Sequence, residues 1–339
     1  MNPYKNCRLC PRRCGVDREA GETGFCGETS ALRIGFAGIH RGEEPPITGR
    51  GGSGTIFISG CNLGCAFCQN YQVSQKGMGR AVSAEEFARI CFALEEKGAE
   101  NINIVTGSHA APAIALGLEA ARKQGLSIPA LWNSSGYDGE ETIEILKDLV
   151  DVYLPDLKTL DPGIASRFFN AQDYPECATA AILKMMELRK LQIQEDSMAS
   201  GVMVRHLVIP GFLENTRRVL KWFSESCSGA GGGKALLSLM TQYTPVYTDG
   251  PEAGAKKKIP DGYVSENEYE AVISMLDEFK IDDGFCQELV TGSDWLPDFR
   301  RANPFSSELS IPVWHCDTAS LLSAPSGKKY KPKQAHNCS

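Results

Sequence analysis

The chain has 339 residues, which is long enough for one large α/β domain with additions or for two modest domains. A net charge of −7 predicts no basic face for nucleic acid, and no stretch reaches the roughly 20 apolar residues of a membrane span. The first residues also lack the apolar core of a signal peptide. The 13 cysteines therefore indicate metal or redox chemistry in a reducing cytoplasm, not a disulfide framework.

Residues 1–53 are predicted to form a cysteine-rich knuckle and an entry loop. The spacing C-x2-C-x3-C-x11-C places four thiols within 20 residues, at Cys7, Cys10, Cys14 and Cys26. Four thiolates close a coordination sphere, so we expect structural zinc or an auxiliary four-iron cluster, and the spacing leaves both open. The segment "GIHRGEEPPITG" then predicts an ordered, hydrogen-bonded loop, with a proton or substrate contact by His40, Glu43 or Glu44 as the alternative.

A strand–helix period begins at residue 54. Ser83 and Glu86 form a capping box at the start of the first long helix. Six apolar strands are predicted, at 55–59, 101–105, 128–132, 150–154, 202–209 and 235–240. Because these strands are nearly continuous in apolar residues, both faces of a parallel sheet should be buried. We expect an α/β fold, a partial (βα)6 TIM-like barrel over residues 54–282, with a doubly wound sheet as the competing fold.

Two segments follow the period. Residues 283–316 are rich in proline and aromatic residues and are predicted to form a strap that packs on the barrel. Residues 317–339 have the composition of a disordered tail. Cys91, Cys177 and Cys227 lie in predicted helices and are expected to be small buried hydrophobes. His206 is expected to be a satisfied buried histidine, whereas His109 is a candidate substrate contact.

Polar groups recur at the carboxyl ends of the strands, where barrel enzymes place their sites. The first strand is followed by three cysteines with the spacing C-x3-C-x2-C. Three thiolates on a four-iron cluster leave one iron open to a substrate or cofactor. The polar positions are Cys61, Cys65, Cys68, residues 106–109 and 133–135, Asp156, Lys158 and residues 241–243, with Arg205 inside the fifth strand.

The cysteine motif, with Phe67 as its aromatic residue, resembles that of the radical S-adenosylmethionine (SAM) enzymes. This resemblance implies a [4Fe-4S] cluster held by Cys61, Cys65 and Cys68, with SAM chelated to the open iron. An electron from the cluster then cleaves SAM, and the resulting 5′-deoxyadenosyl radical abstracts hydrogen from a substrate. The resemblance also implies a flavodoxin-like or ferredoxin-like electron donor.

Further segments between residues 54 and 245 resemble the activating enzymes of glycyl-radical proteins, such as pyruvate formate-lyase activating enzyme. The segments are "FCQN", "WNSSGY", "YLPDLK" and "VRHLVIPG". By this resemblance the residues that hold SAM are Phe67, Asn70, Gly107, Asn133, Ser134, Asp156, Lys158 and Arg205. The chain departs from the activases after the second strand, where "VTGSHAAP" replaces the motif that binds the SAM amino group, so Thr106, Ser108 or backbone carbonyls would have to serve.

The leading function is hydrogen abstraction from a glycine of a protein partner. Radical modification of another peptide or of a small molecule is the alternative within enzymes. An iron–sulfur or zinc scaffold that carries electrons is the alternative outside them, although a carrier needs no polar groups after all six strands.

Overall fold

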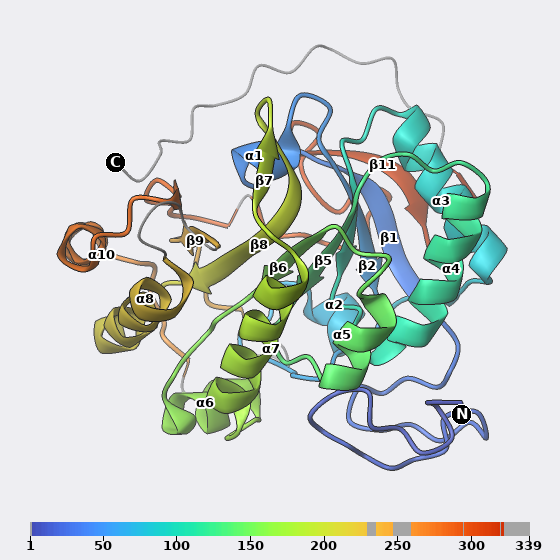
Figure 1. Ribbon diagram of the computed structural model, residues 1–339, viewed down its shortest axis with the longest axis horizontal. Coiled ribbons are helices and arrows are strands. Elements are labelled where there is room, and N and C mark those ends of the chain that lie inside the picture. Colours follow the sequence, from blue (N-terminus) through green and yellow to red (C-terminus); the bar gives the residue numbers. More distant parts are fainter. Residues whose placement is uncertain (1, 229–234, 247–258, 294, 319, 322–339) are drawn as a thin grey trace.

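The computed structural model describes residues 2–228, 235–246, 259–293, 295–318 and 320–321. All six predicted strand–helix units are present in one mixed sheet that does not close (Figure 1). The order of its strands is β10-β9-β8-β6-β5-β4-β2-β1-β11. The expected partial barrel is therefore confirmed over the doubly wound alternative. The expected tail lies outside the described residues from 322 onward.

The strands from β2 to β10 in this order run parallel, and the two at the other end are antiparallel to their neighbours. Their bounds are β1 Arg33–His40, β2 Ser53–Ile58, β4 Ile102–Val105, β5 Ala130–Ser134, β6 Val152–Pro155, β8 Ser197–Leu207, β9 Leu236–Met240, β10 Gly284–Cys286 and β11 Ser310–His315. Two short strands lie off this path, β3 Arg80–Ala81 beside β1 and β7 Gln192–Gln194 beside β8.

Six helices of the described residues cover one face of the sheet (Figure 1). They are α3 Ala84–Glu96, α4 Ala111–Lys123, α5 Glu140–Leu146, α7 Tyr174–Leu188, α8 Leu213–Cys227 and α10 Glu266–Phe279. Ser83 and Glu86 form the predicted capping box at α3. The other described helices are α1 Pro45–Thr48, α2 Tyr71–Ser74, η1 Ser108–Ala110 and α6 Pro162–Phe169.

Several elements were not predicted. Residues 33–40, expected within the N-terminal entry region, form β1, and the expected strap supplies β10 and β11. The sheet thus continues across both expected boundaries, at residues 53 and 282. Short strands such as β10 carry too few residues to show a period. Tertiary pairing decides them: residues 284 to 286 pair in register with residues 237 to 239 of β9.

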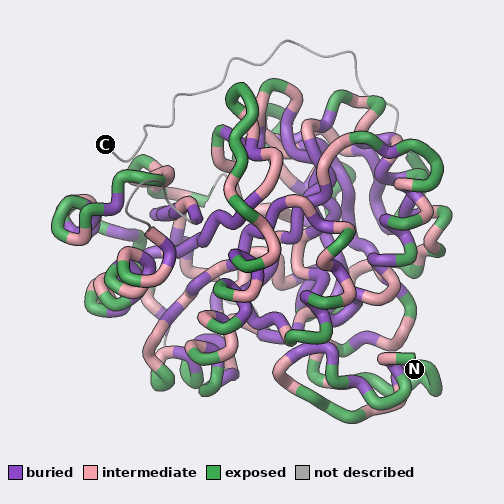
Figure 2. Tube along the Cα trace, viewed as in Figure 1, coloured by how far each residue is buried: buried purple, intermediate pink, exposed green. Residues whose placement is uncertain are grey.

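The core has two sides, because alternate residues of each strand face opposite directions. On the helix-covered side Trp132 and Tyr153 are fully buried in the large cluster. On the inner side Leu131 and Val152 pack with Ile47 of α1, so α1 enters the concave face. Figure 2 shows that the strands are buried along most of their length, whereas the outer turns of the helices are exposed. No helix in the described segments is long and apolar enough to cross a membrane.

Two of the three cysteines predicted to be buried, and the histidine predicted to be buried, are so. Cys91 and Cys227 are fully buried in α3 and α8, whereas Cys177 of α7 is only partly buried. His206 is fully buried, with Nδ1 2.7 Å from the carbonyl oxygen of Leu157 and Nε2 3.0 Å from the hydroxyl of Thr216. Both ring nitrogens therefore have partners, as expected for a packing histidine.

We predict that His206 makes the fold sensitive to acid. Burial lowers the pKa of His206 to about 4, below the ordinary value of 6.5. Between these two values the unfolded chain binds a proton that the folded chain does not, so stability is full above pH 6.5 and falls as the pH drops toward 4. The loss from this residue should be about 2 kcal/mol between pH 7 and pH 5.

Anaerobic urea titrations at pH 7 and pH 5 measure this loss. His206→Gln should be less stable at pH 7 but should lose about 2 kcal/mol less than the parent on acidification. His109 is present in both proteins, so the loss of stability that remains in His206→Gln includes its contribution. If His206→Gln and the parent lose the same free energy of unfolding between pH 7 and pH 5, His206 is not the cause of the acid sensitivity.

Candidate functional site

The loop after β2 carries the three cysteines of the motif. It begins at Gly60, whose φ of +80° suits glycine, and runs into α2. The backbone N–H of Leu63 donates to Sγ of Cys61 at 3.3 Å, and the hydroxyl of Ser74 lies 3.2 Å from Sγ of Cys68. Each of the three cysteine residues is partly exposed as a whole. The loop thus presents three sulfur ligands at the carboxyl end of the first parallel strand.

A partly buried cation, Lys158, lies within electrostatic range of these thiols. Burial raises the pKa of Cys61, Cys65 and Cys68, and the Lys158 ammonium opposes this rise at each. Burial lowers the pKa of Lys158 itself, but Asp156, Cys65 and Tyr174 together outweigh this and the net shift is upward. A positive charge beside three thiols favours their ionised, metal-binding form.

Asp156 and Lys158 form an ion pair with each other at the end of β6. Their side chains are only 22% and 19% exposed, so this is not a solvent-exposed surface pair. The Tyr174 hydroxyl accepts the backbone N–H of Lys158 at 3.0 Å and lies 2.8 Å from the carbonyl oxygen of Asp156. Both residues are therefore held in place just beyond β6, and their ion pair places them on the same side, as expected for residues i and i+2 of an extended segment.

The end of β4 has unusual backbone geometry. Thr106 adopts a φ of +62°, a left-handed conformation that is rare for a β-branched residue. At Gly107 an added Cβ would lie 2.7 Å from both Ile114 and Trp132, so only glycine fits. Strain of this kind persists where the surrounding structure enforces it and is often found at functional sites. It falls in the segment that replaces the activase motif for the SAM amino group.

Asp138 is a buried residue that the sequence analysis did not single out. Its carboxylate accepts hydrogen bonds from Ser108 at 2.7 Å, from Trp132 Nε1 at 3.3 Å and from Ser134. Burial raises its pKa above the ordinary value, and these donors only partly offset the rise. Asp138 therefore fastens the loops after β4 and β5 together. In sequence it looks like an ordinary turn residue in "SGYDGE", and only the fold brings its donors to it.

The remaining predicted SAM residues lie around the same edge. The register aligns Phe57 with Val105, Val105 with Asn133 and Ser134 with Pro155, so these strands end level. Asn133 and Asn70 are partly exposed, Asn70 at the start of α2. The hydroxyl of Ser134 instead donates a hydrogen bond to the carboxylate of Asp138. Phe67 is buried, its ring centroid 5.0 Å from that of Tyr243 and 5.6 Å from that of Phe168.

Arg205 has partners that the sequence analysis did not foresee. Its guanidinium donates to Glu43 at 2.5 Å and to Glu44, and the Arg205 side chain is only 8% exposed. Burial raises the pKa of Glu44, but Arg205 outweighs this and holds it below the ordinary value. The predicted contact of Arg205 with SAM stays a prediction, and any such contact has to compete with two carboxylates.

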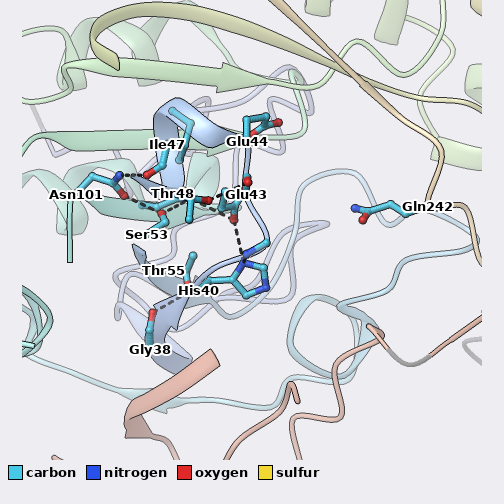
Figure 3. Close-up of polar contacts among 12 residues, drawn as sticks. Gly38, His40, Glu43, Glu44, Ile47, Thr48, Ser53, Thr55, Asn101 and Gln242 are labelled. Carbon is cyan, nitrogen blue, oxygen red and sulfur yellow. Dashed lines mark hydrogen bonds and ion pairs between the residues drawn. The ribbon is translucent and has the colours of Figure 1, made fainter. Parts of the chain in front are cut away.

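The entry loop is ordered and hydrogen-bonded, as its leading interpretation predicted. The Thr48 hydroxyl donates to the Glu43 carbonyl at 2.8 Å, and Asn101 joins the Ile47 carbonyl to Ser53 (Figure 3). His40 Nδ1 lies 3.7 Å from the Glu43 carboxylate. In the same view Gln242 lies apart from this network.

His109 is not placed to meet a substrate freely. Its side chain is 2% exposed, and Nε2 lies 2.7 Å from the carbonyl oxygen of Ser59, just before the cysteine loop. The backbone carbonyl oxygen of His109 accepts a hydrogen bond from the guanidinium of Arg18, which belongs to the N-terminal segment. His109 thus joins β2, η1 and the N-terminal segment.

The residues at this edge fit a thiolate-held cluster and a polar ligand. Three sulfur donors leave a four-iron cluster one open position, and Lys158 provides a compensating cation. The buried hydroxyl of Ser135, beside Asn133, has no hydrogen-bond partner among the described residues. Buried polar groups rarely stay unpaired, so this hydroxyl is suited to receive a ligand group.

The comparisons agree with this arrangement. The sequence model of the radical SAM superfamily matches residues 55–223. The uncharacterized protein MJ0674 of Methanocaldococcus jannaschii is 29% identical over 292 residues, which cover 83% of this chain and 77% of that protein.

Three solved structures are similar to this chain to different degrees. HydG, a maturase of the FeFe-hydrogenase, has a TM-score of 0.50 and 17% identity, covering 73% of this chain and 53% of that one. SAM-bound SuiB of Streptococcus suis has a TM-score of 0.47 and 15% identity, covering 67% of this chain and 48% of SuiB. A domain of the Bacteroides vulgatus pyruvate-formate lyase-activating enzyme has a TM-score of 0.35 and 14% identity, covering 50% of this chain and 87% of that domain. The chain spans about half the length of HydG and SuiB.

Proposed function

We propose that residues 55–223, which match the sequence model of the radical SAM superfamily, form a radical SAM domain, and that the chain abstracts hydrogen from a peptide or protein, with a glycine of a protein partner as the leading target. Domains of this superfamily bind a [4Fe-4S] cluster and SAM and need an external electron donor. Together these supply a one-electron cleavage of SAM that generates a hydrogen-abstracting radical. A cytoplasmic location is part of the proposal.

Each residue at the site then has a proposed role. Cys61, Cys65 and Cys68 hold the cluster, and Lys158 offsets its negative charge. Asp156 orients Lys158 and offers a carboxylate oxygen to the SAM ammonium. The half-buried Asn133 and the unpaired Ser135 hydroxyl would receive polar groups of SAM. The buried ring of Phe67 keeps water from one side of the cysteine loop.

The observation that supports this function best is that thiols, an ammonium and a carboxylate lie near one another at one edge of the sheet. The thiols of three partly exposed cysteine residues lie within electrostatic range of one ammonium, which is held in turn by a mostly buried carboxylate. A carrier of electrons would not need an ion pair and an unpaired hydroxyl beside its cluster. The resemblance of "FCQN" and "YLPDLK" to activase segments favours a protein glycine over a small molecule.

The test follows the hydrogen atom. The anaerobically reconstituted, reduced protein is mixed with SAM and with a glycyl-radical protein prepared with α-deuterated glycine. We expect 5′-deoxyadenosine, and mass spectrometry should find deuterium in it. Deoxyadenosine without deuterium would move the proposal to another peptide or a small molecule. The absence of deoxyadenosine would favour the scaffold or electron carrier.

Asp156→Asn should weaken SAM binding while the fold and cluster remain. The amide keeps the shape of the side chain but removes the charge that holds Lys158. Equilibrium dialysis with labelled SAM measures the affinity, which should fall by about tenfold, the equivalent of ~1.4 kcal/mol. The cluster's visible absorption and the melting temperature should stay near those of the parent.

Two results would contradict this role of Asp156. Unchanged SAM affinity would make the ion pair irrelevant to the cofactor. Loss of the cluster or of the fold would make it structural. Asp161→Asn is a matched control, because Asp161 caps α6 and lies outside the cysteine loop.

A further inference from the structure

The four N-terminal cysteines belong to a segment that packs against the catalytic loop. Figure 1 shows this segment at the lower edge of the view, as α6 is, and away from α1. Cys7 and Cys10 are buried, Cys26 is partly buried and Cys14 is exposed. The set therefore has one side inside the protein and one side open to solvent.

Arg12 connects this set directly to the catalytic loop. It follows Cys10 by two residues and precedes Cys14 by two. Its guanidinium donates to the carbonyl oxygens of Asn62 at 2.9 Å and Leu63 at 3.4 Å, which lie between Cys61 and Cys65. Covalent bonds and one hydrogen bond thus form a continuous path from Cys10 to Cys61.

A second path runs through Cys26. A Cβ added at Gly60 would lie 2.7 Å from the carbonyl oxygen of Cys26, so the two backbones are in contact one residue before Cys61. The same added atom would lie 2.4 Å from the side chain of Glu28. Any side chain at residue 60 would separate the two cysteine-bearing segments.

Arg18 supplies a buried positive charge at the inner side of the set. It is 1% exposed, and Nη1 lies 3.8 Å from Sγ of Cys7. Its other hydrogen bonds go to the carbonyl oxygens of Glu28, Thr29 and His109. A guanidinium held against a thiol stabilises an anionic centre, and more so when that centre gains an electron.

The fold brings the four cysteine-bearing segments together. The backbone N–H of Gly15 donates to the carbonyl oxygen of Cys7 at 2.9 Å, and a Cβ added at Gly24 would lie 2.8 Å from Sγ of Cys14. Four thiolates close around one zinc ion or hold a four-iron cluster. Because zinc has no redox chemistry and an iron–sulfur cluster does, the two paths to the catalytic loop favour the cluster.

We propose that Cys7, Cys10, Cys14 and Cys26 hold a second four-iron cluster that passes electrons to the catalytic one. The relay rests on the proposed function, whereas the metal assignment does not. A low-potential protein donor, a reduced flavodoxin or ferredoxin, gives up one electron near exposed Cys14. That electron leaves toward Cys61 and is consumed in the one-electron cleavage of SAM. No bond forms or breaks at the N-terminal site.

The first experiment identifies the metal. The Cys61→Ala/Cys65→Ala/Cys68→Ala variant is reconstituted anaerobically with iron and sulfide in the presence of equimolar zinc. We expect about four irons and four sulfides per chain, and an electron paramagnetic resonance signal after reduction. About one zinc and no iron would overturn the assignment. Binding of neither metal would overturn it as well.

The second experiment tests the relay in the protein with both sites intact. Reduction of the catalytic cluster is followed by freeze-quench paramagnetic resonance, with reduced flavodoxin or with dithionite as donor. In Cys14→Ser, flavodoxin should reduce the catalytic cluster no faster than in a donor-free control, while dithionite still reduces it. Cys177→Ser, which alters a partly buried thiol on α7, should behave as the parent.

The outcomes separate the two proposals. Equal flavodoxin-driven rates in Cys14→Ser and the parent would overturn the relay even if iron is found. If Cys14→Ser loses the fold of the N-terminal segment, Arg12→Leu serves instead, because it removes the guanidinium that bridges to Asn62 and Leu63 and leaves all seven cysteines in place. A parent protein that cleaves no SAM would contradict the proposed function, while the iron content of the triple variant still decides the metal.

Discussion

The Cys61→Ala/Cys65→Ala/Cys68→Ala variant is expected to form no 5′-deoxyadenosine from SAM under reducing conditions. The three thiols are the sulfur donors at the carboxyl end of β2, and Lys158 acts on the electrostatics of all three. Without them no iron is left in position to bind SAM, so the loss should be complete. Chromatographic measurement of deoxyadenosine over several hours, with dithionite as reductant, gives the rate.

Two controls make this result specific. Cys177→Ala changes a thiol outside both cysteine sets and should cleave SAM at the parent rate. The circular dichroism of the triple variant should match the parent, because the loop makes most of its contacts through its backbone, as at Arg12 and Gln75. Deoxyadenosine at the parent rate in the triple variant would refute the assignment of the catalytic cluster.

Arg205→Leu should destabilise the protein by about 3–5 kcal/mol, because it leaves two buried carboxylates without a cation. Glu43 and Glu44 are 14% and 9% exposed, so water replaces the lost guanidinium poorly. Burial alone would raise the pKa of Glu44, and without Arg205 this carboxyl should take up a proton. Anaerobic urea unfolding at pH 7 measures the free energy.

The matched variant removes all three charges. Glu43→Gln/Glu44→Gln/Arg205→Leu should regain most of the stability lost in Arg205→Leu, since replacing a whole buried ionic group costs far less than breaking it. SAM affinity of this triple variant also tests the earlier prediction for Arg205. Parent-like stability in Arg205→Leu would mean that the ion pairs do not form in solution.

The cysteine loop could be predicted because its chemistry is local. Cys61, Cys65 and Cys68 lie within eight residues, and the strand before them is continuously apolar. Their distance from one another is limited by the chain itself, whatever the rest of the fold does. Asp156 and Lys158 were predictable for the same reason, because two residues of an extended segment face the same side.

The partners of Arg205 could not be predicted in this way. Glu43 is 162 residues away in the sequence, and it meets Arg205 only because β1 and α1 bring the entry loop into the concave face. Asp138 was missed for a related reason. Its three hydrogen-bond donors come from β5 and η1, which are separate in sequence and adjacent only in the sheet.

The sequence by itself therefore determined the βα period, the three-thiol motif and the four-thiol N-terminal set, because apolar periodicity and short cysteine spacings are properties of neighbouring residues. Tertiary structure alone decided that β1 and β11 extend the sheet and that Glu43 and Glu44 pair with Arg205. It also decided that the backbone of Cys26 lies against Gly60. These contacts join residues tens to hundreds of positions apart, and their free energy comes from burial and pairing that exist only once the chain has folded.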